Sequence, residues 1–163
     1  MRNNQISDIS PLSGLTMLGT LSLGGNDIGD ITPLSSLTNL TRLWLYSNQI
    51  SDISSLSGLT NLTSLEINTN QIIDIGSLSG LINLTHLELG SNDIIDIGPL
   101  SGLTNLSGEL LLSANQIIDI KPLVDNTGLG EGDLVELYSN PLSDTSINDY
   151  IPQLMDRGVG VGW

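Results

Sequence analysis

A few short alternating stretches carry most of the side chains in this chain that could bind a ligand or react with one. Arg42, Trp44 and Tyr46 alternate with leucines, and the single histidine, His86, alternates with a leucine and Glu88. Trp, Tyr and Arg are the residue types that contribute most to protein–protein binding. An imidazole beside carboxylates is instead a set that could hold a divalent ion or exchange protons. The spatial arrangement of these stretches therefore decides between binding and catalysis.

The stretches belong to an internal repeat that spans nearly the whole chain. An asparagine recurs at steps of 22, 23 or 25 residues, with Leu or Val five residues before it, Leu or Ile three before it and Ile or Leu two after it. The Leu-x-Leu alternation predicts a short strand with leucines inward and the intervening residues outward. Because the pattern has a fixed period, successive strands should lie side by side as a parallel sheet. The repeated asparagines are Asn26, Asn48, Asn70, Asn92, Asn115 and Asn140.

The repeated asparagine has a structural explanation. It stands where the chain leaves each predicted strand and turns, so backbone groups there would be buried without partners. A neutral amide supplies one acceptor and two donors, and it can satisfy these groups without burying a charge. An aspartate follows four residues later, often with a proline three residues beyond it, as at Asp30 and Pro33. This pair predicts the start of a turn or a short 3₁₀ segment on the opposite, convex side.

The repeat units resemble those of a known family. Residues 4–16 (NQISDISPLSGLT) and 39–50 (NLTRLWLYSNQI) resemble the 22-residue leucine-rich repeats of bacterial internalins. The resemblance covers nearly all of residues 4–142 and implies an α/β fold, a right-handed leucine-rich-repeat solenoid. Such a solenoid has a curved parallel sheet on its concave face, short 3₁₀ or extended turns on its convex face, and here a C-terminal capping helix. The resemblance also implies a protein of the bacterial cell surface, or a secreted one, whose concave sheet binds a protein ligand. Internalins begin with a helical cap, whereas this chain opens in mid-coil at Asn4, so a fragment of a longer protein and a short relative both remain open.

The apolar pattern changes after Asn140, which divides the chain in two. We expect about six coils over residues 1–142, the first of them partial, and a C-terminal cap over 143–163. In the cap, apolar residues at helical spacing predict a helix over about 146–157, and alternating valines predict a final strand over about 159–161. The cap would cover the apolar end of the last coil.

Both ends carry a more specific expectation. Ser146 with Asp149 resembles a capping box, and Pro152 should kink or divide the helix because it has no N–H to donate. At the other end, the strand within residues 20–24 is the first in the sheet and carries no Lys or Pro to block pairing with another chain. We therefore expect fraying, or self-association, at this uncapped N-terminal end.

Charge and composition exclude several classes of partner. Acidic residues outnumber basic ones by 18 to 4, which gives a net charge of −14. Nucleic acids and anionic membrane surfaces attract Lys and Arg, so neither is expected as a partner. The chain has no cysteine, hence no disulfide and no thiolate metal site. No apolar run approaches the roughly 20 residues of a membrane span, so membrane insertion is not expected.

The residues six, four and two positions before each repeated asparagine are predicted to face outward. On strands about 4.8 Å apart they form three columns. These columns hold one of the two tryptophans, the only histidine and four of the five glutamates. We expect a protein ligand to bind here, on a set of residues that we call the concave surface. The set comprises Arg42, Trp44, Tyr46, Glu66, Asn68, His86, Glu88, Glu109, Leu111, Glu136 and Tyr138.

Two alternatives stay open. Glu66 lies next to Glu88 in the columns, and His86 lies next to Glu109, so a divalent-ion or hydrolytic site is conceivable. A catalytic site normally sits in a pocket that excludes water, whereas this face is open, so we assign no catalytic residue, metal ligand or cofactor. The near identity of the repeats equally suits a structural spacer or repeat arm of a larger protein.

Overall fold

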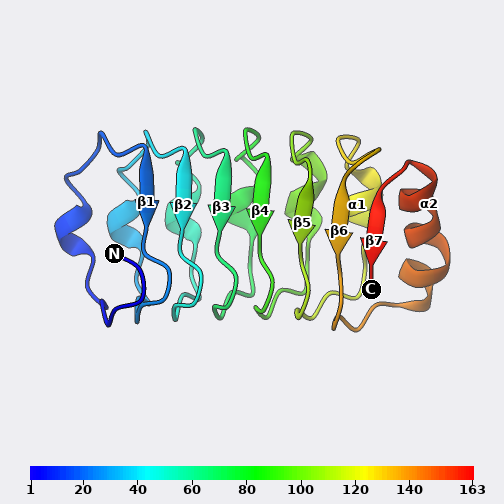
Figure 1. The fold of residues 1–163 in the computed structure, drawn as a ribbon, viewed down its shortest axis with the longest axis horizontal. Coiled ribbons are helices and arrows are strands. Elements are labelled where there is room, and N and C mark those ends of the chain that lie inside the picture. Colours follow the sequence, from blue (N-terminus) through cyan, green and yellow to red (C-terminus); the bar gives the residue numbers. More distant parts are fainter.

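The chain forms a single sheet of seven parallel strands, one for each successive coil. The computed structural model describes residues 1–163, and its strands follow the order β1 to β7 without a crossover (Figure 1). Between strands the chain returns behind the sheet, which makes a right-handed solenoid and confirms the fold expected from the repeat (Figure 1). The strands are β1 (Thr20–Ser22), β2 (Arg42–Trp44), β3 (Ser64–Glu66), β4 (His86–Glu88), β5 (Glu109–Leu111), β6 (Leu134–Glu136) and β7 (Gly160–Gly162).

Short helical turns form the convex side, and an aspartate opens each of them. The Asp30 carboxylate, for example, accepts a hydrogen bond from the Thr32 N–H at 2.8 Å. The N-cap residue itself is Ile31, so the aspartate acts from one position earlier than an N-cap, as in an Asx turn. In the longer sixth coil the turn becomes an α-helix. These segments are η1 (Ser10–Leu12), η2 (Thr32–Leu34), η3 (Ser54–Leu56), η4 (Gly76–Leu78), η5 (Gly98–Gly102) and α1 (Lys121–Asp125).

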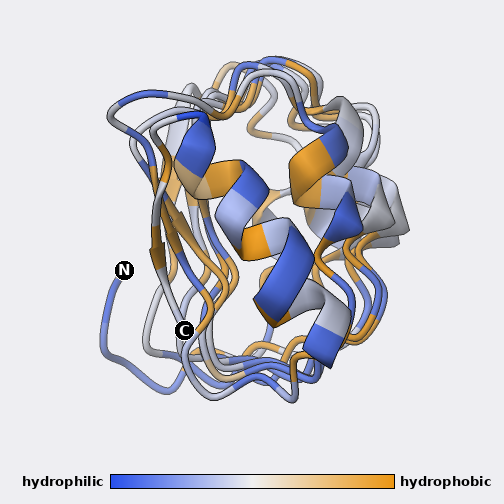
Figure 2. Ribbon diagram, turned by 90° about the vertical axis from the view of Figure 1, so that its right-hand side faces the viewer, coloured by the Kyte–Doolittle hydropathy of each residue, from blue (hydrophilic) through white to orange (hydrophobic).

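The core runs along the whole solenoid between the sheet and the turns. It is one cluster of 41 buried hydrophobic residues. Figure 2 looks along the stack from the C-terminal end and shows the coils superimposed, with the sheet on one side and the turns on the other. Because each coil places its leucines and isoleucines at the same positions, every layer packs against a nearly identical one. This regular packing fixes the outward direction of the alternate strand residues.

The asparagine ladder joins each coil to the one before it. The side-chain oxygen of Asn115 accepts a hydrogen bond from the Ile94 N–H at 3.0 Å. Its NH₂ group donates to the carbonyls of Leu89 (3.1 Å) and Leu112 (3.0 Å). Ala114, just before it, has a φ of 56°, so the backbone turns through the left-handed region there. The amide thus satisfies backbone groups that this turn leaves without partners.

The C-terminal cap differs in detail from the expectation. Helical structure runs over 144–156 and comprises a π-helical segment, η6 (Ser146–Tyr150), and α2 (Ile151–Asp156). Pro152 lies in the first turn of α2, directly after the change from π to α geometry.

The predicted capping box at Ser146 is wrong. Ser146 lies inside the helix, where its hydroxyl donates to the Ile118 carbonyl (2.9 Å) and accepts from the Ile120 N–H (3.2 Å). Ser143 instead caps the helix, because its hydroxyl oxygen accepts from the Ser146 N–H at 3.1 Å. Ser146 therefore fixes the cap to the preceding coil.

The first four residues run beside the end of β1 and the turn that follows it. The Asn3 and Asn4 N–H groups donate to the carbonyls of Gly24 (3.0 Å) and Gly25 (2.9 Å). The N-terminal amino group donates to the Ser22 carbonyl at 3.1 Å. β1 is the first strand of the sheet, as expected, and the amino terminus covers the Ser22 carbonyl at its end. Self-association at this end stays a prediction.

Acid should loosen the convex turns. Backbone N–H donors at the start of the turns hold the pKa of Asp8, Asp30 and Asp52 below the ordinary value of 3.8. A pKa lowered by folding means that the stabilising contribution is complete above pH 3.8 and is lost as the pH falls through the lower folded value. We expect acidification below about pH 4 to lower the melting temperature. The decrease should be smaller when all three aspartates are changed to Asn. The control is Asp27→Asn; an identical acid response in the triple variant would contradict this explanation.

Candidate ligand-binding surface

The parallel register aligns the outward residues in columns. Arg42 pairs with Thr20 on one side and with Ser64 on the other, and Ser64 pairs with His86. The inward residue between the outward positions is fully buried, as at Leu43, so the alternation holds. The middle column consists of Ser22, Trp44, Glu66, Glu88, Leu111, Glu136 and Gly162.

None of the eleven residues of the concave surface is buried. They lie on the strands or two residues after them. Arg42, Glu109 and Tyr138 are exposed, and the other eight are half-buried. A half-buried side chain on a rigid sheet loses little freedom when a ligand covers it, which favours binding. The surface is therefore accessible and already ordered.

An aromatic cluster occupies the N-terminal part of the surface. The guanidinium carbon of Arg2 lies 4.9 Å from the centre of the Trp44 ring and 5.9 Å from that of Tyr46, within the range of cation–π attraction. The Arg2 Nε also donates to the Ser22 hydroxyl at 2.6 Å. Tyr46 lies over Gly24, where an added Cβ would clash with the ring. Sequence reasoning missed Arg2 because it precedes the first full repeat.

An acidic cluster with the only histidine occupies the centre. Glu66 and Glu88 are register partners on β3 and β4, and the His86 Nε2 lies 3.3 Å from a Glu88 carboxylate oxygen. The ion pair of His86 is thus with Glu88 on its own strand, not with Glu109. Burial raises the pKa of the Glu66 carboxyl, and the negative charge of Glu88 raises it further. The indole N–H of Trp44 lies near enough to oppose this shift, but without hydrogen-bonding geometry.

The concave surface is open and contains no pocket. The three hollows found on the molecule are lined by residues within 1–18, 51–54, 74 and 77, and none of them includes a concave-surface residue. An open sheet suits contact with a macromolecule better than enclosure of a small substrate. No helix in the chain has the length and apolar character needed to cross a bilayer.

A second exposed apolar column lies outside the concave surface. Ile73, Ile95 and Ile118 are 60%, 55% and 51% exposed, and each stands three residues after a ladder asparagine. Earlier coils have small residues at this position, such as Gly29 and Ser51. The Ile-Ile pairs in the sequence are the signal that could have revealed this column, because the repeat needs only the first isoleucine of each pair in the core.

Comparison with known proteins agrees with this geometry. A leucine-rich-repeat family profile, described as two copies of the repeat, matches residues 16–58 and again 38–80. The crystal structure of internalin C2 from Listeria monocytogenes is similar over 99% of this chain and 69% of its own, with 36% identity and a TM-score of 0.85. The chain belongs to the internalin-like leucine-rich-repeat family. No curated protein sequence matches it.

Two further structures are similar to this internalin-like chain but longer. An internalin of L. monocytogenes (InlF) is 36% identical with a TM-score of 0.86, and this chain covers 46% of it. A leucine-rich-repeat protein of Leptospira interrogans is 25% identical with a TM-score of 0.86, and this chain covers 41% of it. The internalin-like chain thus spans less than half of either. Solenoids of this kind are generally non-enzymatic scaffolds with an extended binding face.

Proposed function

We propose that this internalin-like chain is an interaction module that binds a protein ligand on its concave surface. The observation that carries the proposal is the outward position of Trp44 beside Tyr46 on a rigid sheet, where neither ring contributes to the core cluster. Arg2 and Arg42 flank them. Aromatic side chains flanked by arginine are typical of the energetic centre of an interface.

The charge of the surface indicates the chemistry of the ligand. Glu66, Glu88, Glu109 and Glu136 face the same side as Trp44, and the whole chain has a net charge of −14. Complementarity then favours a ligand with basic side chains around an apolar or aromatic contact. The affinity for this ligand should decrease as salt is added, because salt screens the attraction between the glutamates and the basic side chains of the ligand.

We propose a location on the basis of the relatives. Similarity to two internalins supports a bacterial protein that acts at the cell surface or after secretion.

Self-association through the N-terminal end is a separate proposal that rests on the uncovered part of the β1 edge. Sedimentation equilibrium tests it: a monomer at all concentrations would exclude it.

Removing both rings should abolish ligand capture without unfolding the chain. We expect Trp44→Ala with Tyr46→Ala to weaken binding at least about 100-fold, since each hot-spot ring contributes about 2 kcal/mol or more. The immobilised chain would capture the ligand at low salt, and calorimetry would then measure the affinity of the purified ligand. Met155→Ala, which removes an exposed apolar side chain from α2, is the control and should bind normally. Equal affinity of the double variant and the wild type, both with unchanged melting, would refute the proposed surface.

A further inference from the structure

Three potential metal ligands converge at the centre of the concave surface. Glu66 lies on β3, and His86 and Glu88 lie on β4. One ligand atom from each side chain can be chosen so that all three lie within 4.8 Å of one another. All three side chains are half-buried, so an ion can reach them from solvent.

The repeat does not require the two glutamates. The same column carries Ser22, Trp44 and Leu111 in other coils, so the fold accepts neutral side chains there. Like charges directly opposite each other on neighbouring strands are unfavourable. No Lys or Arg forms an ion pair with Glu66 or Glu88; the only ion pair in the cluster is that of His86 with Glu88. A cation between the carboxylates would remove this repulsion.

The donor set selects the kind of cation. One imidazole nitrogen and two carboxylate oxygens suit Zn²⁺, which binds nitrogen and oxygen at about 2.0–2.2 Å in tetrahedral geometry. Such geometry needs ligand atoms about 3.4 Å apart, so small side-chain rotations would close the present spacing. Ca²⁺ and Mg²⁺ prefer sites made of oxygen ligands alone, so the imidazole nitrogen favours Zn²⁺ over them. We propose that Glu66, His86 and Glu88 bind one Zn²⁺ on the concave surface, with the fourth coordination position open to solvent.

The surroundings of His86 set the expected affinity. Apart from the contact of its Nε2 with Glu88, the His86 ring has no carboxylate or carbonyl partner that would hold it in one orientation. Such partners raise the affinity of a metal site. Without them, we expect a dissociation constant for Zn²⁺ of about 10 µM rather than a nanomolar one.

Zinc titration of the full chain tests the site without any protein ligand. The chain is freed of metal with a chelator and titrated with ZnCl₂ in competition with a chromophoric chelator. We expect one site, and at least about tenfold weaker binding in His86→Ala, Glu66→Gln and Glu88→Gln, as removal of a ligand should cause. Ca²⁺ or Mg²⁺ at about 1 mM should not displace the zinc.

Glu136→Gln is the matched control, because Glu136 shares the column but lies two strands from Glu88. It should bind zinc as the wild type does, and all variants should show unchanged circular dichroism. Zinc binding weaker than about 1 mM would overturn the proposal. It would be overturned equally if His86→Ala bound zinc as tightly as the wild type, since binding would then come from dispersed carboxylates.

Discussion

Asn115→Ala should destabilise the chain by about 2–4 kcal/mol. The side chain of Asn115 is 2% exposed and bonds the Ile94 N–H and the carbonyls of Leu89 and Leu112. Alanine would leave the buried Ile94 N–H without a partner, which costs about 1–3 kcal/mol. It would also remove one of two donors from each carbonyl, since Leu89 still accepts from Asn92 (2.9 Å) and Leu112 from Asn140 (3.0 Å). The loss is a large part of the roughly 5–15 kcal/mol that stabilises a typical domain. Urea unfolding followed by circular dichroism measures it.

Asn105→Ala is the control for this prediction. Asn105 is also an asparagine between coils, but it is exposed, and its side chain makes one hydrogen bond, to the Ile82 carbonyl. Its loss should cost less than about 1 kcal/mol, because water can replace that bond. Similar losses for the two variants would show that the ladder amide has no special role in the stability of the coils.

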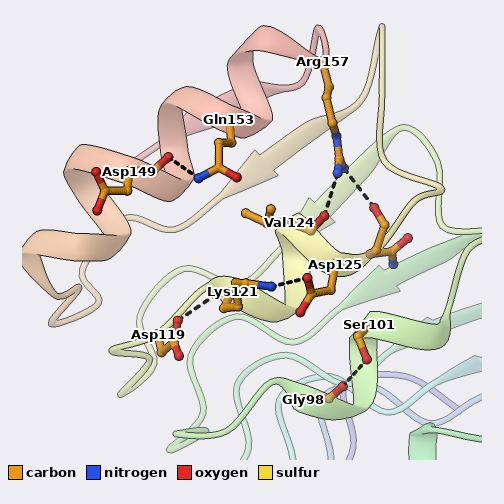
Figure 3. A network of polar contacts seen from close by, with 10 residues as sticks. Gly98, Ser101, Asp119, Lys121, Val124, Asp125, Asp149, Gln153 and Arg157 are labelled. Carbon is orange, nitrogen blue, oxygen red and sulfur yellow. Dashed lines mark hydrogen bonds and ion pairs between the residues drawn. The ribbon is translucent and has the colours of Figure 1, made fainter.

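Arg157→Ala should release the C-terminal cap at a cost of about 2–4 kcal/mol. The guanidinium of Arg157 donates to the carbonyls of Val124 (2.7 Å), Asn126 (2.9 Å) and Leu129 (2.8 Å). Figure 3 shows the side chain reaching from the end of α2 to the Val124 carbonyl at α1. Hydrogen bonds from a charged donor contribute about 1.5–3 kcal/mol each, partly offset by desolvation of the guanidinium. Hydrogen exchange should accelerate over residues 144–162 before the rest of the solenoid opens.

Arg157→Lys tests whether the fork geometry matters. An ammonium group is a compact point charge and does not reproduce the planar array of a guanidinium, so this variant should recover only part of the loss. Lys121→Ala is the control, because Lys121 forms an exposed ion pair with Asp125 near the same carbonyls (Figure 3). Such pairs contribute about 0–1 kcal/mol. A cap that exchanges equally slowly in Arg157→Ala and in the wild type would refute the role of Arg157.

The periodic part of the molecule was predictable, because one physical pattern determines it. Leu43 and Leu65 are buried, and Trp44 and Glu66 face outward, as a period of two within each strand requires. The fixed step between asparagines then sets the register of neighbouring strands. The parallel sheet, the convex turns and the columns of the concave surface follow from these two periods.

The parts outside the repeat were not predictable in this way. Arg157 bonds carbonyls about 30 positions earlier, and that contact depends on how α2 packs on the last coil. Ser146 occupies a buried place between coils that its local sequence does not reveal, so a local capping rule misassigned it. The pairing of His86 with Glu88 depends on side-chain rotamers, which the repeat leaves free. Arg2 reaches Trp44 only because residues 1–4 run beside β1.

Hydroxyl-radical footprinting of the ligand complex tests the proposed binding face most directly. Aromatic, histidine and methionine side chains report their own solvent exposure in this measurement, and the chain distributes them on different faces. We expect the bound ligand to protect Trp44, Tyr46 and His86, while Met17 and Met155, which are 86% and 52% exposed, stay reactive. Protection of Met17 or Met155 with unchanged reactivity of Trp44 and His86 would place the ligand elsewhere and contradict the account.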